Sequence, residues 1–252
     1  MNPSIALAAL VFAPALALGS FLNVVVARLP EKRSLVRPRS ACPGCGHELS
    51  AWENIPLVSY AVLRGRCRGC KESISLRYPL VELTTAVLVA ACFFRFGLTG
   101  EAALSAFFCA VLVALSAIDF ERYILPDRIV LPSAAIVLAG NIALHPGQTP
   151  EWVAAGLGAS LFLFIALLVY PQGMGMGDVK LALLLGFMLG RYVGAGLMIG
   201  MLAALLPAIF LLARHGAQAR KMKIPFGPFL AFGAIVALFW GEPIMDAYLS
   251  AF

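Results

Sequence analysis

Long runs of apolar residues dominate the chain, and the short polar stretches between them hold nearly all of its charge. A helix needs roughly 20 apolar residues to cross a hydrocarbon core about 30 Å thick, so such runs indicate membrane spans. The pattern predicts an all-α polytopic membrane protein with about eight transmembrane helices, at 4–27, 79–96, 101–118, 128–144, 151–170, 178–190, 193–213 and 226–241. Breaker residues mark turns at 97–100, 145–150, 170–177 and 241–243.

The segment 28–78 breaks this pattern, because it is too polar to cross a membrane and too long to be a simple turn. We therefore expect a first transmembrane helix at 1–27, a small Cys-rich domain at 28–78 and a membrane domain of about seven helices at 79–252. The first apolar run contains no charge before Arg28, whereas a secretory signal begins with basic residues. We interpret it as a retained span.

Composition supports the same class. Hydrophobic residues make up 61% of the 252 residues and charged residues 13%, whereas soluble domains contain roughly 45–50% and about 25%. This balance argues against a water-soluble globule. The net charge of +6 is explained by basic residues that flank the spans, so we do not expect nucleic acid as a partner.

Lysine and arginine set the expected orientation, because cytoplasmic loops of membrane proteins are enriched in both. If the first span ends in the cytoplasm, only Arg95 and Arg191 face the opposite side. The other basic residues are then cytoplasmic: Arg28, Lys32, Arg33, Arg37, Arg39, Arg64, Arg66, Arg68, Lys71, Arg77, Arg122, Arg128, Lys180, Arg214, Arg220, Lys221 and Lys223. This bias requires eight spans with both termini in the periplasm, and it makes the Cys-rich domain cytoplasmic.

The Cys-rich domain contains two C-x-x-C pairs, Cys42 with Cys45 and Cys67 with Cys70, separated by 21 residues. Two such pairs suit a tetrahedral zinc site. Two disulfides are the alternative, although stable disulfides are rare in the reducing cytoplasm. A domain of about 50 residues has little core of its own, and a structural metal would stabilise it. The other two cysteines, Cys92 and Cys109, lie inside spans, where we expect them to be packing residues.

Three aspartates lie at span ends on the expected cytoplasmic side, where ionisable groups are candidates for function. Asp119 and Asp127 belong to A-I-D-F-E-R-Y-I-L-P-D-R, and Asp178 begins the sixth span in G-M-G-M-G-D-V-K. The glycines of the second segment allow helices to approach closely, and a helix N-terminus favours an ionised carboxylate at Asp178.

Two carboxylates that share one proton can hydrolyse a peptide bond, because the ionised member activates water while the neutral member polarises the carbonyl. The three histidines, His47, His145 and His215, are scattered over loops, so a Ser-His-Asp or H-E-x-x-H site is not expected. Two other interpretations stay open from the residues alone. Asp119 and Asp127 can simply flank or cap helix ends, and Asp178 can be the ion site of a transporter.

Seven sequence motifs in a fixed order are similar to those of the type IV prepilin peptidases, which are bifunctional leader peptidases and N-methyltransferases. They are G-S-F-L-N-V-V at 19–25, the two C-x-x-C pairs, N-I-P at 54–56, I-S-L-R-Y-P-L-V-E at 74–82, I-D-F-E-R-Y-I-L-P-D at 118–127, G-M-G-D-V-K-L at 175–181 and P-F-G-P-F-L-A at 225–231. The resemblance covers nearly the whole chain. Presenilin-like proteases also use G-x-G-D but place their aspartates deeper in the bilayer, whereas the polar sequence after Asp119 favours an interfacial site.

The resemblance implies a membrane aspartic endopeptidase with Asp119 and Asp178 as the catalytic pair and Asp127 in a supporting role. It also implies zinc in the Cys-rich domain and S-adenosylmethionine as donor for methylation of the new N-terminal residue. No glycine-rich turn of the dinucleotide-binding type is present, so the residues that bind the donor are unknown.

The implied partners are membrane lipid and the prepilins or pseudopilins of type IV pilus and type II secretion systems, processed at the cytoplasmic face of the bacterial inner membrane. Prepilins carry a short basic leader. We expect acidic side chains to receive it, with Glu48, Glu53, Glu72 and Glu121 as candidates.

Overall fold

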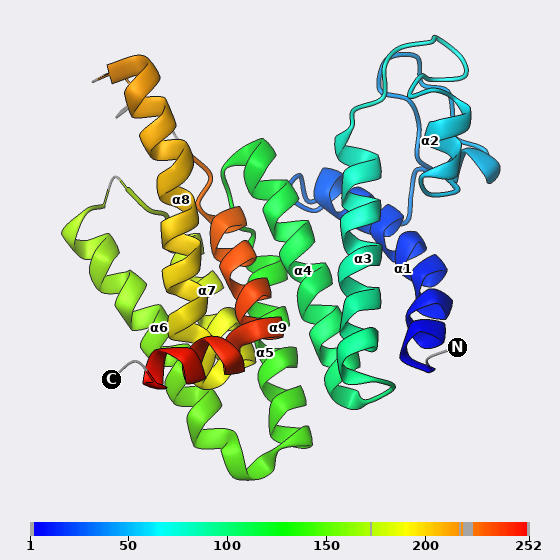
Figure 1. Ribbon diagram of the computed structural model, residues 1–252. Helices are drawn as coiled ribbons and strands as arrows, with labels where there is room; N and C mark the ends of the chain where they lie inside the picture. Colours follow the sequence, from blue (N-terminus) through cyan, green and yellow to red (C-terminus); the bar gives the residue numbers. More distant parts are fainter. Residues whose placement is uncertain (1–2, 172, 217, 219–223, 251–252) are drawn as a thin grey trace. The chain divides into compact units, whose positions relative to one another are not determined.

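The computed structural model of the chain describes residues 3–171, 173–216, 218 and 224–250 (Figure 1). The predicted all-α class is confirmed, since these residues contain helices, loops and only isolated β-bridges. The α-helices are α1 Pro3–Arg28, α2 Val58–Val62, α3 Arg77–Phe96, α4 Gly100–Arg122, α5 Asp127–Leu144, α6 Thr149–Val169, α7 Met176–Leu189, α8 Val193–His215 and α9 Gly227–Ser250. Short 3₁₀ helices within the described residues are η1 Trp52–Asn54, η2 Pro146–Gln148 and η3 Gly190–Tyr192.

Within the described residues, seven helical segments are long and apolar enough to cross a membrane. Each predicted span coincides with a helix, but the sixth and seventh fall in one continuous segment, Met176–His215, which comprises α7, η3 and α8. Gly190 ends α7 with a positive φ of 54°. The 14 residues of α7 rise only about 21 Å, less than the roughly 30 Å of a hydrocarbon core.

The predicted turn at 241–243 is wrong, because α9 continues through Pro243 to Ser250. A proline inside a helix removes one backbone N–H donor and bends the axis without necessarily ending the helix. Figure 1 accordingly shows the red C-terminal part of α9 running in a different direction from its first turns.

The structure divides into two compact units, Met1–Ala117 and Ile118–Phe252, which we describe separately. This division reflects packing. The division predicted from the sequence, at residues 27 and 78, instead separates apolar spans from the polar segment, and it stays a prediction. Arg220, Lys221 and Lys223, which contribute to the predicted orientation, lie outside the described residues.

In the first unit, α1 packs along α3, and the polar segment connects the end of α1 to the start of α3 (Figure 1). Asn23 of α1 donates a hydrogen bond to the backbone oxygen of Tyr78 in α3 over 3.1 Å. Cys92 and Cys109 are fully buried with their Sγ atoms 3.9 Å apart, in agreement with a packing role.

In the second unit, α7 is the central helix: it packs against α5, α6, α8 and α9, and ten of its 14 residues are buried. A helix enclosed by protein does not have to match the thickness of the bilayer, which explains its short length. The side-chain amide of Asn141 in α5 ties to it, donating to the Phe187 backbone oxygen over 2.7 Å. The surrounding helices expose Leu157, Leu161, Leu202 and Leu206, as expected of surfaces that face lipid.

Candidate active site and metal centre

Asp119 lies in the last turn of α4 and is buried, with 5% of its surface exposed. Its Oδ2 accepts a hydrogen bond of 3.0 Å from the backbone N–H of Gly227, the first residue of α9. Helix N-termini present unpaired N–H donors and a positive dipole end, so α9 provides a favourable position for this carboxylate.

Asp178 lies in the first turn of α7 and is also buried, with 8% exposed. Its Oδ2 accepts the backbone N–H of Gly175 over 3.0 Å, while its own N–H donates to the Gly175 oxygen over 3.1 Å. These two bonds cap α7 reciprocally. The cap fixes the side chain of Asp178 relative to the helix start.

The structure brings the two predicted catalytic aspartates together within the second unit, close enough for the charge of Asp119 to act on Asp178. The loop between α4 and α5 contributes to this arrangement through Leu125. Its side chain lies 2.9 Å from the position of a Cβ added to Gly177, and 3.2 Å from that of a Cβ added to Gly227. A side chain at position 177 would displace Leu125 and one at position 227 would press against it, so glycine at both positions lets α7 and α9 start close to the loop.

Asp127 is not part of this buried pair. It is the first residue of α5, and its carboxylate forms an ion pair with Lys180 of α7, with Nζ–O distances of 2.7 and 2.8 Å. The side chains are 55% and 31% exposed. An exposed pair of this kind contributes only about 0–1 kcal/mol to stability. It does, however, link the starts of α5 and α7.

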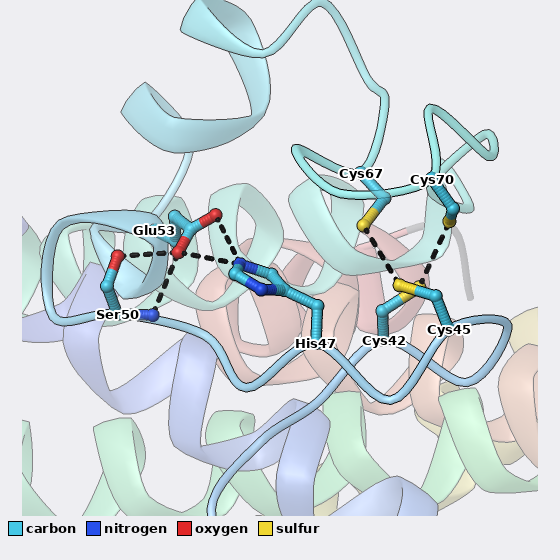
Figure 2. Close-up of polar contacts among 7 residues, drawn as sticks. All are labelled: Cys42, Cys45, His47, Ser50, Glu53, Cys67 and Cys70. Atoms are coloured by element: carbon cyan, nitrogen blue, oxygen red, sulfur yellow. Dashed lines mark hydrogen bonds and ion pairs between the residues drawn. The ribbon is translucent and has the colours of Figure 1, made fainter.

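The four cysteines of the polar segment form a single cluster, with their Sγ atoms all within 4.8 Å of one another. Figure 2 shows the two C-x-x-C loops facing each other, with Cys42 Sγ 3.8 Å from Cys70 Sγ and Cys45 Sγ 3.9 Å from Cys67 Sγ. A tetrahedral site with Zn–S bonds of about 2.3 Å separates its sulfurs by about 3.8 Å. All four thiols are free, so the cluster could hold a metal ion.

The two cysteine loops repeat one backbone design. Cys42 N–H donates to the His47 oxygen over 2.9 Å, and Cys67 N–H donates to the Glu72 oxygen over 2.8 Å. The residue after each second cysteine has a positive φ, 72° at Gly46 and 63° at Lys71. The repeated turn explains why the sulfurs of both loops converge.

Beside this cluster, a buried network is built around Glu53 (Figure 2). The Glu53 carboxylate, with 1% of its side chain exposed, accepts the hydroxyl and the backbone N–H of Ser50 and contacts His47 Nε2 at 3.2 Å. The hydroxyl and then the N–H of Ser50, together with His47, lower the pKa of Glu53 to about 2. The expectation that Glu53 receives a basic leader is therefore wrong, since its carboxylate is buried and engaged.

Sequence reasoning singled out Asp119, Asp178 and the cysteines but not their partners. Gly227 was part of a sequence motif but had no assigned contact, because its partner, Asp119, lies 108 positions away. Lys180 was likewise not assigned a partner, since Asp127 lies 53 positions earlier in the chain.

Fold and site together define a class: a multi-pass membrane protein with two buried aspartates at helix ends and a four-cysteine cluster on a polar loop. The sequence model described as the bacterial peptidase A24 N-terminal domain matches residues 14–96, and that of the type IV leader peptidase family matches residues 106–213. The chain belongs to the type IV leader peptidase family.

Two curated relatives align with the chain over most of their own length. The prepilin leader peptidase/N-methyltransferase of Pseudomonas aeruginosa is 39% identical, with 93% of this chain and 90% of that protein covered. The protein of the same name from Aeromonas salmonicida is 40% identical, with 96% and 93% covered. No solved structure matches the chain.

Proposed function

We propose that this chain is a membrane aspartic endopeptidase that removes the leader of type IV prepilins and pseudopilins and then N-methylates the new terminal residue. The observation that carries the peptidase assignment is the buried pair, Asp119 and Asp178, each fixed by a backbone N–H at a helix start. The relatives' shared name supports both activities.

Peptide hydrolysis by such a pair needs one proton shared between two carboxylates, because two adjacent carboxylates cannot both ionise without a large cost. The ionised aspartate takes a proton from the attacking water, and the neutral one donates a hydrogen bond to the scissile carbonyl. The N–H groups of Gly227 and Gly175 hold the two side chains in place during this transfer. Neither a nucleophilic side chain nor a metal is needed for this step.

Asp127 has a positioning role in this proposal. Its ion pair with Lys180 joins the start of α5 to the turn of α7 that carries Asp178, two residues before Lys180. A misplacement of about 1 Å in a catalytic group can cost 10²-fold in rate. A weak exposed ion pair can therefore matter more for turnover than for folding.

The cysteine cluster is proposed to bind one structural zinc ion through Cys42, Cys45, Cys67 and Cys70. The spacing of the four Sγ atoms supports this assignment. When bound, zinc would supply folding free energy to a segment with little core of its own. S-adenosylmethionine is the proposed methyl donor.

We place the protein in the bacterial inner membrane, with both termini periplasmic and the Cys-rich domain cytoplasmic. All but two of the 19 lysines and arginines lie on the cytoplasmic side in this orientation. The catalytic aspartates, at the end of α4 and the start of α7, then lie at the cytoplasmic interface, where a leader and its apolar helix meet.

Mass spectrometry of a prepilin co-expressed with this chain tests both activities at once. The expected product lacks its leader and carries one additional methyl group at its N-terminus. An intact prepilin in cells that contain the folded enzyme would refute the peptidase proposal, and a cleaved but unmethylated product would refute the second activity.

A further inference from the structure

Three motifs that the aspartate pair does not use meet in the first unit. They are G-S-F-L-N-V-V at 19–25, N-I-P at 54–56 with the following Leu57, and the R-Y-P-L-V-E part of 74–82. Asn23 Nδ2 donates to the Tyr78 oxygen over 3.1 Å, and Leu57 N–H donates to the Glu82 carboxylate over 2.9 Å. The end of α1, the polar segment and the start of α3 are thus connected at one place.

The α1 and α3 backbones touch beside this place. A Cβ added to Gly19 would lie 2.6 Å from the Cα of Glu82, so no side chain fits at position 19. Asn23 lies one helical turn beyond Gly19 and faces the same part of α3. The close approach therefore keeps the Asn23 amide beside the first turns of α3.

Glu82 is buried, with 8% exposed. Within the described residues its carboxylate receives hydrogen bonds from Leu57 N–H and from the Ser20 hydroxyl, both neutral donors. A buried carboxylate normally has a cation or several donors as partners, because desolvation of the charge is costly. No basic side chain of the described chain pairs with Glu82, so it is able to accept a cationic ligand.

Asn23 provides the second observation. It is 95% buried, and its Oδ1 has no hydrogen-bond partner among the described residues. The amide orientation is fixed, because the Tyr78 oxygen requires the NH₂ end. A buried acceptor left without a donor calls for a ligand that supplies one.

We infer that Asn23 and Glu82 bind the α-amino group of the newly cleaved substrate for N-methylation, an assignment that rests on the proposed second activity. A primary ammonium offers three N–H donors, which suit an amide oxygen and a carboxylate. The proposed peptidase step uses neither of these side chains. Their site lies where α1 and α3 meet the polar segment. In the proposed orientation this is the cytoplasmic interface, where cleavage leaves the new N-terminus.

Glu82 accepts one proton from the ammonium, which leaves a neutral amine with a free lone pair. The amine nitrogen attacks the methyl carbon of a methylsulfonium donor, so that the N–C bond forms as the C–S bond breaks. The sulfonium leaves as a neutral thioether, and the product is a secondary ammonium. The proton on Glu82 returns to water.

Glu82→Gln distinguishes a role of the Glu82 charge in methylation from a purely structural role of this side chain. Glutamine keeps the size and an oxygen acceptor for Leu57 N–H but removes the negative charge. In co-expression with a prepilin, we expect cleavage within about twofold of wild type and methylation reduced about 100-fold, the usual scale of a general base. Asn23→Ala should reduce methylation in the same selective way. Thr85→Ser, on the same buried face of α3, is the control and should preserve both activities.

Binding supplies a readout apart from turnover. Purified full-length protein should bind a synthetic peptide of the mature substrate N-terminus about tenfold more tightly than its N-acetylated form. The Glu82→Gln protein should lose this preference. Any of three results would overturn the assignment: normal methylation by both variants, equal loss of cleavage and methylation, or equal binding of the two peptides by wild type. Failure of the peptidase proposal is distinct, because it appears as uncleaved prepilin with wild-type enzyme.

Discussion

The cysteine cluster and the aspartate pair achieve close approach of functional groups in opposite ways. The cysteines lie within 29 residues of one another, in two short turns whose backbone hydrogen bonds are local. The aspartates lie 59 positions apart, and each is fixed by the start of a helix in a packed bundle. The cysteine loops form the turns that a metal site needs, but they have almost no apolar core. The aspartate pair lies in a large packed core and needs no added ligand. The two should therefore fail under different perturbations.

Loss of the metal should give the largest effect and should affect only the cysteine region. Cys42→Ser is expected to release the metal and unfold the segment between α1 and α3, since structural zinc supplies on the order of 10–16 kcal/mol in small zinc domains. The spans should stay inserted. Metal analysis and limited proteolysis of the segment measure both effects. Cys92→Ala, a cysteine outside the cluster, should keep the metal content unchanged, and freshly purified wild type without zinc would contradict the assignment.

A methyl group at Gly227 should damage the aspartate pair while leaving the cysteine region intact. The added Cβ would lie 2.9 Å from Asp119 Oδ2 and 3.2 Å from Leu125. We expect Gly227→Ala to shift the carboxylate and reduce cleavage about 10²-fold, measured with a synthetic prepilin peptide. Gly158→Ala in α6, where a Cβ meets nothing within 4 Å, is the matched control. Equal activity of the two variants would show that the Gly227 contact is unimportant.

The Asp127–Lys180 pair should give a smaller effect on the same site. Asp127→Asn is expected to lower cleavage by about two- to tenfold, with a change in unfolding free energy of less than about 1 kcal/mol. Exchanging the charges, with Asp127→Lys and Lys180→Asp in one protein, should restore much of the lost rate. Complete loss of cleavage in Asp127→Asn would instead make this residue part of the catalytic group.

Loss of the Glu53 charge should give the smallest effect, confined to the cysteine region. Because the pKa of Glu53 is lowered to about 2, its ionised form stabilises the folded segment above the unfolded pKa of about 4.3. That contribution falls as the pH drops from about 4.3 toward 2. The stability difference between wild type and Glu53→Gln should shrink over this acid range, as measured by denaturant unfolding. A difference independent of pH would contradict this account.

The sequence was sufficient for features that depend on local spacing. The apolar runs predict each long helix, and the two C-x-x-C pairs predict the cluster, because in both cases neighbouring residues carry the signal. The contact between Asp119 and Gly227 could not be predicted, since it depends on where distant helices begin. The same holds for the burial of α7, which makes a short helix acceptable, and for α9, whose packing lets it continue past Pro243.

The most direct test of the central claim compares Asp119→Asn and Asp178→Asn with Asp127→Asn in one cleavage assay with purified, folded enzyme. Asparagine keeps the shape of the side chain but can neither take a proton from water nor share one with a second carboxylate. We expect a loss of about 10³-fold or more for each of the first two variants, and substantial activity for the third. Cleavage near the wild-type rate by either Asp119→Asn or Asp178→Asn would contradict the central claim.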